Sequence, residues 1–223
     1  MNEEIEDKDG AQKTSEELLS LFSVPLAKTT IGRSFTEKEI DCIVNIPMIY
    51  NKEAQGAQGS QSEYFDIFDN AKTKKELKDI KTFCERKLKR YMEEIEGVNT
   101  NSVTLQITES WLTKLKPQEC HTLHNHHNSH LSGILYIRCL PNDSIQFANR
   151  NLMFDQSLEL PKKKTTQFTA KEVIVNIKEG DFIIFPSWVP HQVRMNETKN
   201  KERISLSFDT WPKHLPSLYP PFK

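Results

Sequence analysis

Apolar and polar residues repeat with two different periods along this chain, and the change comes at Gly97. In residues 73–96 the apolar positions are three or four residues apart, which places them on one face of an α-helix. An earlier helix is predicted over 36–46, because Thr36 and Glu39 have the spacing of a capping box. Gly97 is a natural end for the longer helix.

Beyond Gly97 the apolar residues alternate with polar ones, a pattern that predicts half-buried β-strands. In the last of these strands, Ile204, Leu206 and Phe208 face one way, and polar side chains face the other. Several strands after two helices indicate two packed sheets, as in a jelly roll. Strands are expected at 21–27 (an edge strand, because of Pro25), 103–111, 134–140, 145–148, 173–177, 182–185 and 203–208, and loops at 51–62 and 149–169, the second a possible lid.

The composition is that of an ordinary soluble protein with one sizeable domain. The chain has 223 residues, of which 27% are charged and 36% hydrophobic, and its formal net charge is −1. Single hydrophobic cores stop growing only near ~250–300 residues. No concentrated basic stretch indicates a nucleic-acid partner, and no apolar run reaches the ~18–20 residues that span a bilayer. We therefore expect a cytoplasmic protein whose four cysteines are reduced and mostly buried.

The acidic N-terminus is expected to lie outside the folded domain. Residues 1–20 contain seven acids and two lysines, a composition typical of disordered segments. We assign 21–223 to a single domain, in which a strand and helices at 21–97 precede a jelly-roll core at 98–211. Residues 212–223 form an apolar, proline-rich tail.

Histidines are concentrated in one short stretch. Five of the seven fall within ten consecutive residues, and a sixth, His191, follows an apolar run. Such clusters are the usual signature of a metal site, although a polar loop with solvated histidines is the simpler alternative. On a β-strand His124 and His126 share one face, whereas His121 and His127 point to the other. Two such ligands need a third from elsewhere, and His191 is the natural donor.

Several short motifs surround these histidines in a fixed order. They are Ser110-Trp111, His124-Asn125-His126-His127-Asn128-Ser129, Ser132-Gly133-Ile134-Leu135-Tyr136, Gly180-Asp181, Phe185-Pro186-Ser187-Trp188, His191, and Arg203-Ile204-Ser205-Leu206-Ser207-Phe208. In this order they resemble the 2-oxoglutarate/Fe(II)-dependent oxygenases of bacteria and marine phages. The resemblance covers about residues 21–211. It implies a mainly β fold with N-terminal helices and a double-stranded β-helix (jelly-roll) core.

The resemblance also implies Fe(II) as the metal and 2-oxoglutarate as the co-substrate. It places the far carboxylate of 2-oxoglutarate on Arg203 and Ser205, and an arginine fork beside a hydroxyl suits a buried carboxylate. Tyr136 is expected to donate a further hydrogen bond. The alternative for Arg203 is a surface ion pair, which its alternation with serines rather than acids makes less favourable.

The implied metal ligands are His124, His126 and His191, with no catalytic residue beyond them. Most of the superfamily has an acid where His126 stands, although the family resembled here shares the histidine. The substitution leaves three possibilities: an all-histidine Fe(II) site, a carboxylate recruited from Glu119 or Asp181, or another metal such as zinc or manganese. We favour the all-histidine site.

Several other residues near the motifs are open to more than one interpretation. Asn125, Asn128 and Ser129 either orient the metal ligands or satisfy the backbone of a turn. Trp111 and Trp188 either pack in the core or wall the substrate pocket, and packing in the core is the favoured prediction for both. Cys120 beside the histidines is a weaker candidate ligand, because Fe(II) oxygenase sites favour imidazole and carboxylate over thiolate.

The function expected from these features is that of a dioxygenase. The protein would use O₂ to hydroxylate an unidentified small molecule or protein, with release of succinate and CO₂. One rival is a cupin-like three-histidine dioxygenase that oxidises its substrate without 2-oxoglutarate. The other is a non-catalytic binding module in which the metal only holds the fold together.

Overall fold

The computed structural model of the protein describes four stretches of the chain, residues 23–51, 59–149, 161–166 and 168–213. The acidic tail predicted at 1–20 lies outside them. Most of the C-terminal tail and the middle of the predicted lid also lie outside the described residues. The assignments made for those segments stay predictions.

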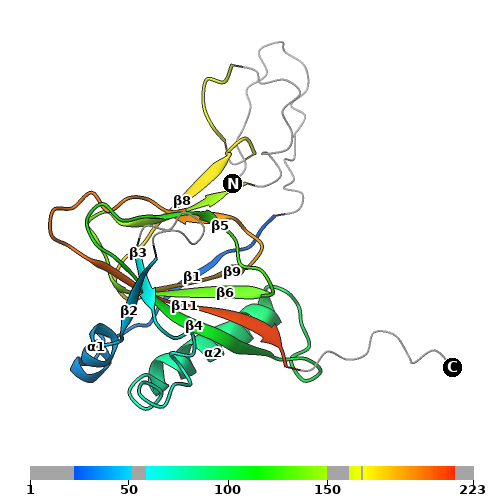
Figure 1. Ribbon diagram of the computed structural model, residues 1–223. Helices are drawn as coiled ribbons and strands as arrows, with labels where there is room; N and C mark the ends of the chain where they lie inside the picture. The colour runs from blue at the N-terminus through cyan, green and yellow to red at the C-terminus, as the bar shows by residue number, and fades with distance from the viewer. Residues whose placement is uncertain (1–22, 52–58, 150–160, 167, 214–223) are drawn as a thin grey trace, which may run out of the picture.

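Two antiparallel sheets pack against each other and form a jelly roll (Figure 1). The larger sheet has seven strands in the order β1-β9-β6-β11-β4-β3-β2, and the smaller has the order β5-β10-β7-β8. The strands of the larger sheet are β1 (Ala27–Thr30), β2 (Met48–Asn51), β3 (Gly59–Ser62), β4 (Leu105–Leu115), β6 (Leu131–Arg138), β9 (Asp181–Pro186) and β11 (Arg203–Pro212). Those of the smaller sheet are β5 (His121–His124), β7 (Ser144–Ala148), β8 (Glu172–Asn176) and β10 (His191–Val193).

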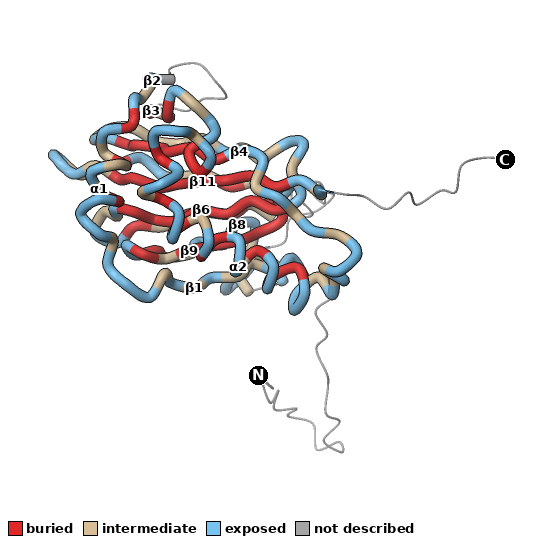
Figure 2. The backbone as a smooth tube through the Cα atoms, turned by 90° about the horizontal axis from the view of Figure 1, so that it is seen from below, coloured by how far each residue is buried: buried red, intermediate tan, exposed pale blue. Residues whose placement is uncertain are grey.

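Two helices cover the outer face of the larger sheet, α1 (Glu37–Val44) and α2 (Lys78–Glu94) (Figures 1 and 2). The capping box is present: Thr36 Oγ1 accepts from Glu39 N, and the Glu39 carboxylate accepts from Thr36 N. The longer helix begins five residues later than predicted, because the residues before Lys78 form turns. No helix in the described part of the chain is long and apolar enough to cross a membrane.

The larger sheet is buried on both faces because its strands supply apolar side chains to two cores (Figure 2). In β11, Ile204, Leu206 and Phe208 point toward the helices, as the alternation predicted. In β6, Ile134 and Tyr136 point the other way, into a core shared with β7 and β9. Because β6 and β11 pack on both faces, they form a rigid support for the side chains that point between the two sheets.

Several strand predictions are confirmed, but β1 has other bounds, and β2, β3, β5 and β10 were not among the predicted strands. The edge strand β1 begins at Ala27 rather than at residue 21, and it pairs with β9. β2 and β3 were missed, and β3 falls in the predicted loop 51–62, because its sequence Gly-Ser-Gln-Ser has no apolar alternation. All four cysteines are free, as expected, although only Cys84 is fully buried.

Candidate metal centre

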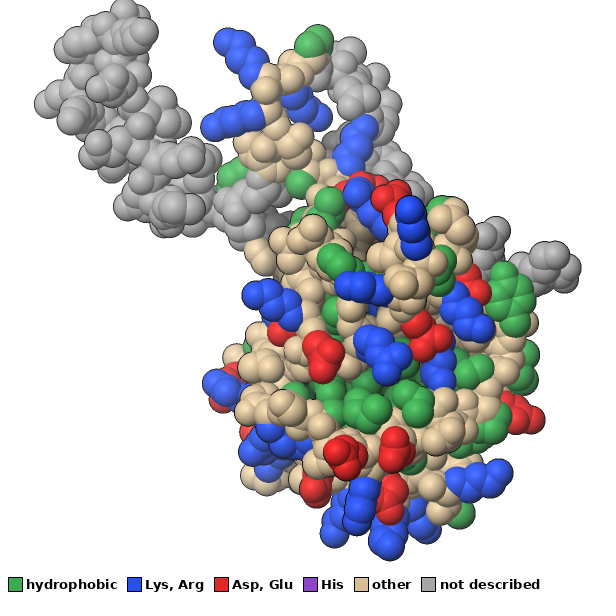
Figure 3. Space-filling view, turned by 90° about the vertical axis from the view of Figure 1, so that its left-hand side faces the viewer, with side chains coloured by type: hydrophobic (Ala, Val, Ile, Leu, Met, Phe, Trp, Pro, Cys, Tyr) green, Lys and Arg blue, Asp and Glu red, His purple; other side chains and the backbone are tan. Residues whose placement is uncertain are grey.

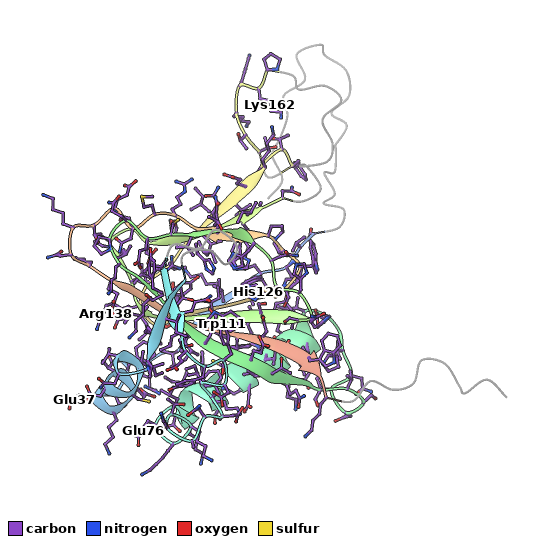
Figure 4. All side chains as sticks on the ribbon, in the orientation of Figure 1. Glu37, Glu76, Trp111, His126, Arg138 and Lys162 are labelled. Carbon is purple, nitrogen blue, oxygen red and sulfur yellow. The ribbon has the colours of Figure 1, made fainter. Side chains whose placement is uncertain are left out.

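His124, His126 and His191 come together between the two sheets, with His126 near the centre of the fold (Figure 4). His124 ends β5 and pairs in register with His191, the first residue of β10. His126 lies two residues beyond the end of β5, so it reaches the site from a loop and not from the strand itself. Among the described residues, these three form the group whose ligand atoms all lie within 4.8 Å of one another. Adjacent ligands of an octahedral ion are about 3 Å apart, so small ring rotations would close the group around a metal.

The hydrogen bonds of the three rings leave the same nitrogen free in each. His124 Nδ1 lies 2.7 Å from the Thr122 carbonyl oxygen, and His191 Nδ1 lies 3.1 Å from that of Val189. His126 Nδ1 lies 2.7 Å from Asp209 Oδ1. These oxygens only accept, so each Nδ1 carries the proton and each Nε2 presents its lone pair. This is the tautomer that a metal ligand bound through Nε2 requires.

Burial favours the neutral form of two of these imidazoles, those of His124 and His191. It lowers the pKa of His124, and it lowers the pKa of His191, which is 2% exposed, well below the usual value. Neighbouring imidazoles lower the pKa of His191 further, because their positive forms would repel one another. Neutral rings are the form that binds metal, so the site does not need to lose protons first at neutral pH.

His121 faces the same cavity as the other three histidines, so the prediction that it points to the opposite face was wrong. Its ring is stacked on that of His124, with ring centroids 4.1 Å apart. The pairing of β5 with β10 is irregular: His191 opposes His124, but Val193 opposes His121, so β5 has one extra residue. This bulge turns His121 inward. Burial then lowers its pKa to about 3.

The remaining histidines of the stretch lie outside the site. His127 is exposed, as parity predicted. His130 Nε2 is 3.1 Å from Oε2 of Glu96, two residues beyond the end of α2. Cys120 does not belong to the group that could hold a metal.

Neither acid proposed as a recruited ligand is near the metal centre. Glu119 accepts from the backbone N–H of Lys116, and Asp181 pairs with Lys28 at 2.9 Å. The acid at the site is Asp209, which sequence reasoning missed. It lies on β11, 83 residues from His126, and no local pattern marks it.

A chain of serine hydroxyls continues from this acid. Ser132 Oγ donates to Asp209 Oδ1 at 2.6 Å and lies 2.8 Å from Ser187 Oγ, which is 2.7 Å from Ser129 Oγ. Ser129 therefore supports the metal centre through this network. Asn128 has a positive φ of 56°, which fits the alternative role of a turn residue.

Arg203, Ser205 and Ser207 line the cavity with the histidines, as the alternation of β11 predicted. Arg203 is 2% exposed and Tyr136 is fully buried on the neighbouring strand β6. Within the described residues, the Arg203 Nε and the Tyr136 hydroxyl are the buried side-chain polar atoms that have no hydrogen-bond partner. Buried donors without partners are costly, so this part of the cavity is suited to an anionic ligand.

Arg203 has an acidic neighbour that its sequence surroundings did not indicate. Asp143, which precedes β7, places Oδ1 3.3 Å from Arg203 Nη1. Asp143 also accepts backbone N–H groups from Leu140 and Ser144. The cavity has a free volume of about 20 Å³, room for about one water molecule. A larger ligand therefore has to displace side chains.

The two tryptophans differ from the favoured prediction that both pack in the core, and Trp111 takes the alternative place in a pocket wall. Trp111 is buried but forms a wall of the cavity, with its ring centroid 5.4 Å from that of His126. Phe65, half exposed, lies against its other side at 6.0 Å. Trp188 is 46% exposed.

On the face in Figure 3, basic and acidic side chains are interspersed over the globular part, with lysines gathered on the projecting segment before β8.

Comparison with known proteins gives a family for this region. Residues 109–209 match the model of a family described as "Putative 2OG-Fe(II) oxygenase", where 2OG is 2-oxoglutarate. The matched segment includes all three converging histidines and the arginine. No curated protein matches the sequence.

Solved structures share the fold at low sequence identity. HygX from Streptomyces hygroscopicus, solved with nickel, 2-oxoglutarate and hygromycin B, is 11% identical, with a TM-score of 0.56 over 85% of this chain and 84% of that one. A prolyl hydroxylase from Trichoplax adhaerens, in complex with a hypoxia inducible factor peptide, is 11% identical, with a TM-score of 0.55 over 83% of each chain. A 2OG-Fe(II) oxygenase family oxidoreductase from Burkholderia pseudomallei is 9% identical, with a TM-score of 0.54 over 77% of this chain and 76% of that one. The predicted jelly-roll core is thus confirmed.

Proposed function

We propose that this protein hydroxylates a substrate at the expense of 2-oxoglutarate and O₂, because residues 109–209 match the model of the family described as "Putative 2OG-Fe(II) oxygenase". The observation that carries the proposal is the presence, in one cavity, of three converging imidazoles and a buried arginine whose Nε has no partner. The first group suits a metal and the second suits a carboxylate. A ligand with a metal-chelating end and an anionic end would satisfy both.

The histidines fit Fe(II) as three neutral nitrogen donors. His124, His126 and His191 each present Nε2, because Nδ1 is held by a hydrogen bond. When bound, Fe(II) would bind the keto acid and activate O₂ toward a substrate C–H bond.

The arginine side of the cavity would hold the far carboxylate of 2-oxoglutarate. Arg203 would release Asp143 and donate to the carboxylate, while Ser205 on the same face of β11 and the Tyr136 hydroxyl donate further hydrogen bonds. The apolar lining residues Ile134 and Ile145 exclude water between the two ends of the ligand.

The overall reaction balances as 2-oxoglutarate + O₂ + R–H → succinate + CO₂ + R–OH. One oxygen atom enters the succinate carboxylate, and the other becomes the substrate hydroxyl. The substrate, a small molecule or a residue of a protein, would approach the metal past the aromatic wall of Trp111 and Phe65, which borders His126.

A three-histidine dioxygenase that oxidises its substrate directly is the second candidate. The ligand set favours it, because none of the three residues is a carboxylate. The buried Arg203 and Tyr136 weigh against it, because their unpartnered donors have no role in that reaction.

Anaerobic titration of the Fe(II)-loaded protein with 2-oxoglutarate tests the proposal. Bidentate chelation of Fe(II) should produce a weak visible charge-transfer band. The band should be lost in His191→Ala and retained in His127→Ala, a control in which an exposed histidine of the same stretch is removed. Iron binding without the charge-transfer band would favour the dioxygenase that oxidises its substrate directly. A protein that binds no iron would favour the non-catalytic module in which another metal only holds the fold together.

A further inference from the structure

The negative charge that a carboxylate ligand would bring to this metal centre is present one hydrogen bond further out. Asp209 Oδ1 lies 2.7 Å from His126 Nδ1, and the Asp209 side chain is only 12% exposed. We propose that Asp209 acts through His126 as a positioning residue and supplies the anionic character that the three imidazoles lack. The inference rests on the proposed function only in assuming that His126 binds the metal.

Charge counting shows why such an acid matters. Two histidines and one carboxylate around a divalent ion leave a net charge of one, whereas three neutral histidines leave two. Adding Asp209 to His124, His126 and His191 restores the lower value. The carboxylate makes the hydrogen-bonded imidazole a stronger donor, as in other carboxylate–histidine–metal triads.

The structure also holds Asp209 firmly in this role. Its Oδ1 accepts from Ser132 Oγ at 2.6 Å, and Ser132 Oγ itself lies 3.1 Å from His126 Nδ1. The backbone N–H of His126 donates to the Ser187 carbonyl oxygen at 2.9 Å. His126 is beyond the end of β5, so these contacts replace the strand in setting the direction of its ring. Asp209 thus fixes both the tautomer and the orientation of this ligand.

Asp209→Asn tests the proposal, because the amide oxygen can still accept the Nδ1 proton while the charge is lost. Co(II) affinity, measured by the visible spectrum of the bound ion and by competition with a chelator, should fall about 10- to 100-fold. The Fe(III)/Fe(II) midpoint potential should rise, because Fe(III) needs the anionic charge more than Fe(II) does. Neither measurement depends on turnover or on 2-oxoglutarate.

Two variants serve as controls. Ser132→Ala removes a hydrogen bond to the same carboxylate oxygen but keeps its charge, so the midpoint potential should stay close to the wild-type value. Asp143→Asn removes another buried acid, one that contacts Arg203 instead of a metal ligand, and metal affinity should be unchanged. If Asp143→Asn lowered metal affinity as much as Asp209→Asn, the effect would be a general one of buried charge, and the proposal would be overturned.

The proposal also has a test in the wild-type protein, in case Asp209→Asn does not fold. In the Co(II)-loaded protein, proton NMR should show three exchangeable, strongly shifted imidazole N–H signals, one for each hydrogen-bonded Nδ1. Fewer than three, or unchanged affinity and potential in a folded Asp209→Asn, would refute it. If Asp209→Asn weakens metal binding but the wild-type protein does not bind 2-oxoglutarate, the proposed function is refuted and the role of Asp209 stands. A wild-type protein that binds no metal would refute both.

Discussion

Replacing Arg203 with methionine tests the proposed 2-oxoglutarate anchor, and the size of the effect follows from its contacts. The guanidinium is expected to make two charge-assisted hydrogen bonds to the distal carboxylate, each contributing about 1.5–3 kcal/mol. In the free protein it already lies 3.3 Å from Asp143. At that distance two unit charges attract by about 5 kcal/mol at an effective dielectric constant of 20, before the cost of desolvation is subtracted.

2-Oxoglutarate therefore competes with Asp143 for the Arg203 guanidinium. We expect Arg203→Met to weaken 2-oxoglutarate binding about 100-fold, which is close to 3 kcal/mol. Asp143→Asn should have the opposite effect and strengthen binding, because Arg203 no longer has to leave an anion. If the ion pair only stabilised the fold, the two substitutions would not change the affinity for 2-oxoglutarate in opposite directions.

Calorimetric titration of the Co(II)-loaded protein with 2-oxoglutarate measures both effects. Arg138→Met is the matched control: this arginine is on β6, is half exposed, and pairs with Glu202 at 3.6 Å. Removing one partner of a buried pair can cost 3–5 kcal/mol of stability. The double variant Arg203→Met/Asp143→Asn leaves no unpaired charge and keeps the test valid if Arg203→Met is unstable. Wild-type affinity for 2-oxoglutarate in a folded, metal-binding Arg203→Met protein would refute the reasoning.

Three further predictions concern stability. Chelation of the metal should abolish 2-oxoglutarate binding but leave the far-UV circular dichroism spectrum unchanged, because the apolar cores hold the sheets together; loss of the spectrum would indicate a structural metal. The metal-free protein should lose stability as the pH falls from about 6.5 toward about 3, because His121, His124 and His191 have lowered pKa values when folded, whereas the unfolded chain takes up their protons. The slope is about 1.4 kcal/mol per pH unit for each, measured by urea unfolding, and a flat profile would contradict the burial argument. Gly133→Ala should lower the unfolding free energy by about 1–3 kcal/mol, because the added Cβ would overlap the Phe208 ring across the β6–β11 pair. Thermal unfolding checks this, and an unchanged melting temperature would show that the ring can move aside.

Local patterns in the sequence were enough for much of the fold. The apolar face of α2, the capping box at Thr36 and the alternation in β11 were all read correctly. Each depends on residues a few positions apart, so the backbone geometry of a helix or strand decides the outcome. The three histidines expected as metal ligands do lie close together. The strand spacing that suggested His126 does not hold, however, because His126 lies beyond the end of β5.

Contacts between distant strands could not be read in this way. His121 faces the cavity because β5 has an extra residue opposite β10, and a bulge of this kind leaves no mark in the histidine spacing. Asp209 reaches His126, and Asp143 reaches Arg203, because the register of one strand against another places them there. The sequence by itself indicated which histidines and which arginine would meet in one cavity. Only the tertiary structure decided which acid contacts His126 and which contacts Arg203, because register and bulges are set by the packing of both sheets together and not by any single strand.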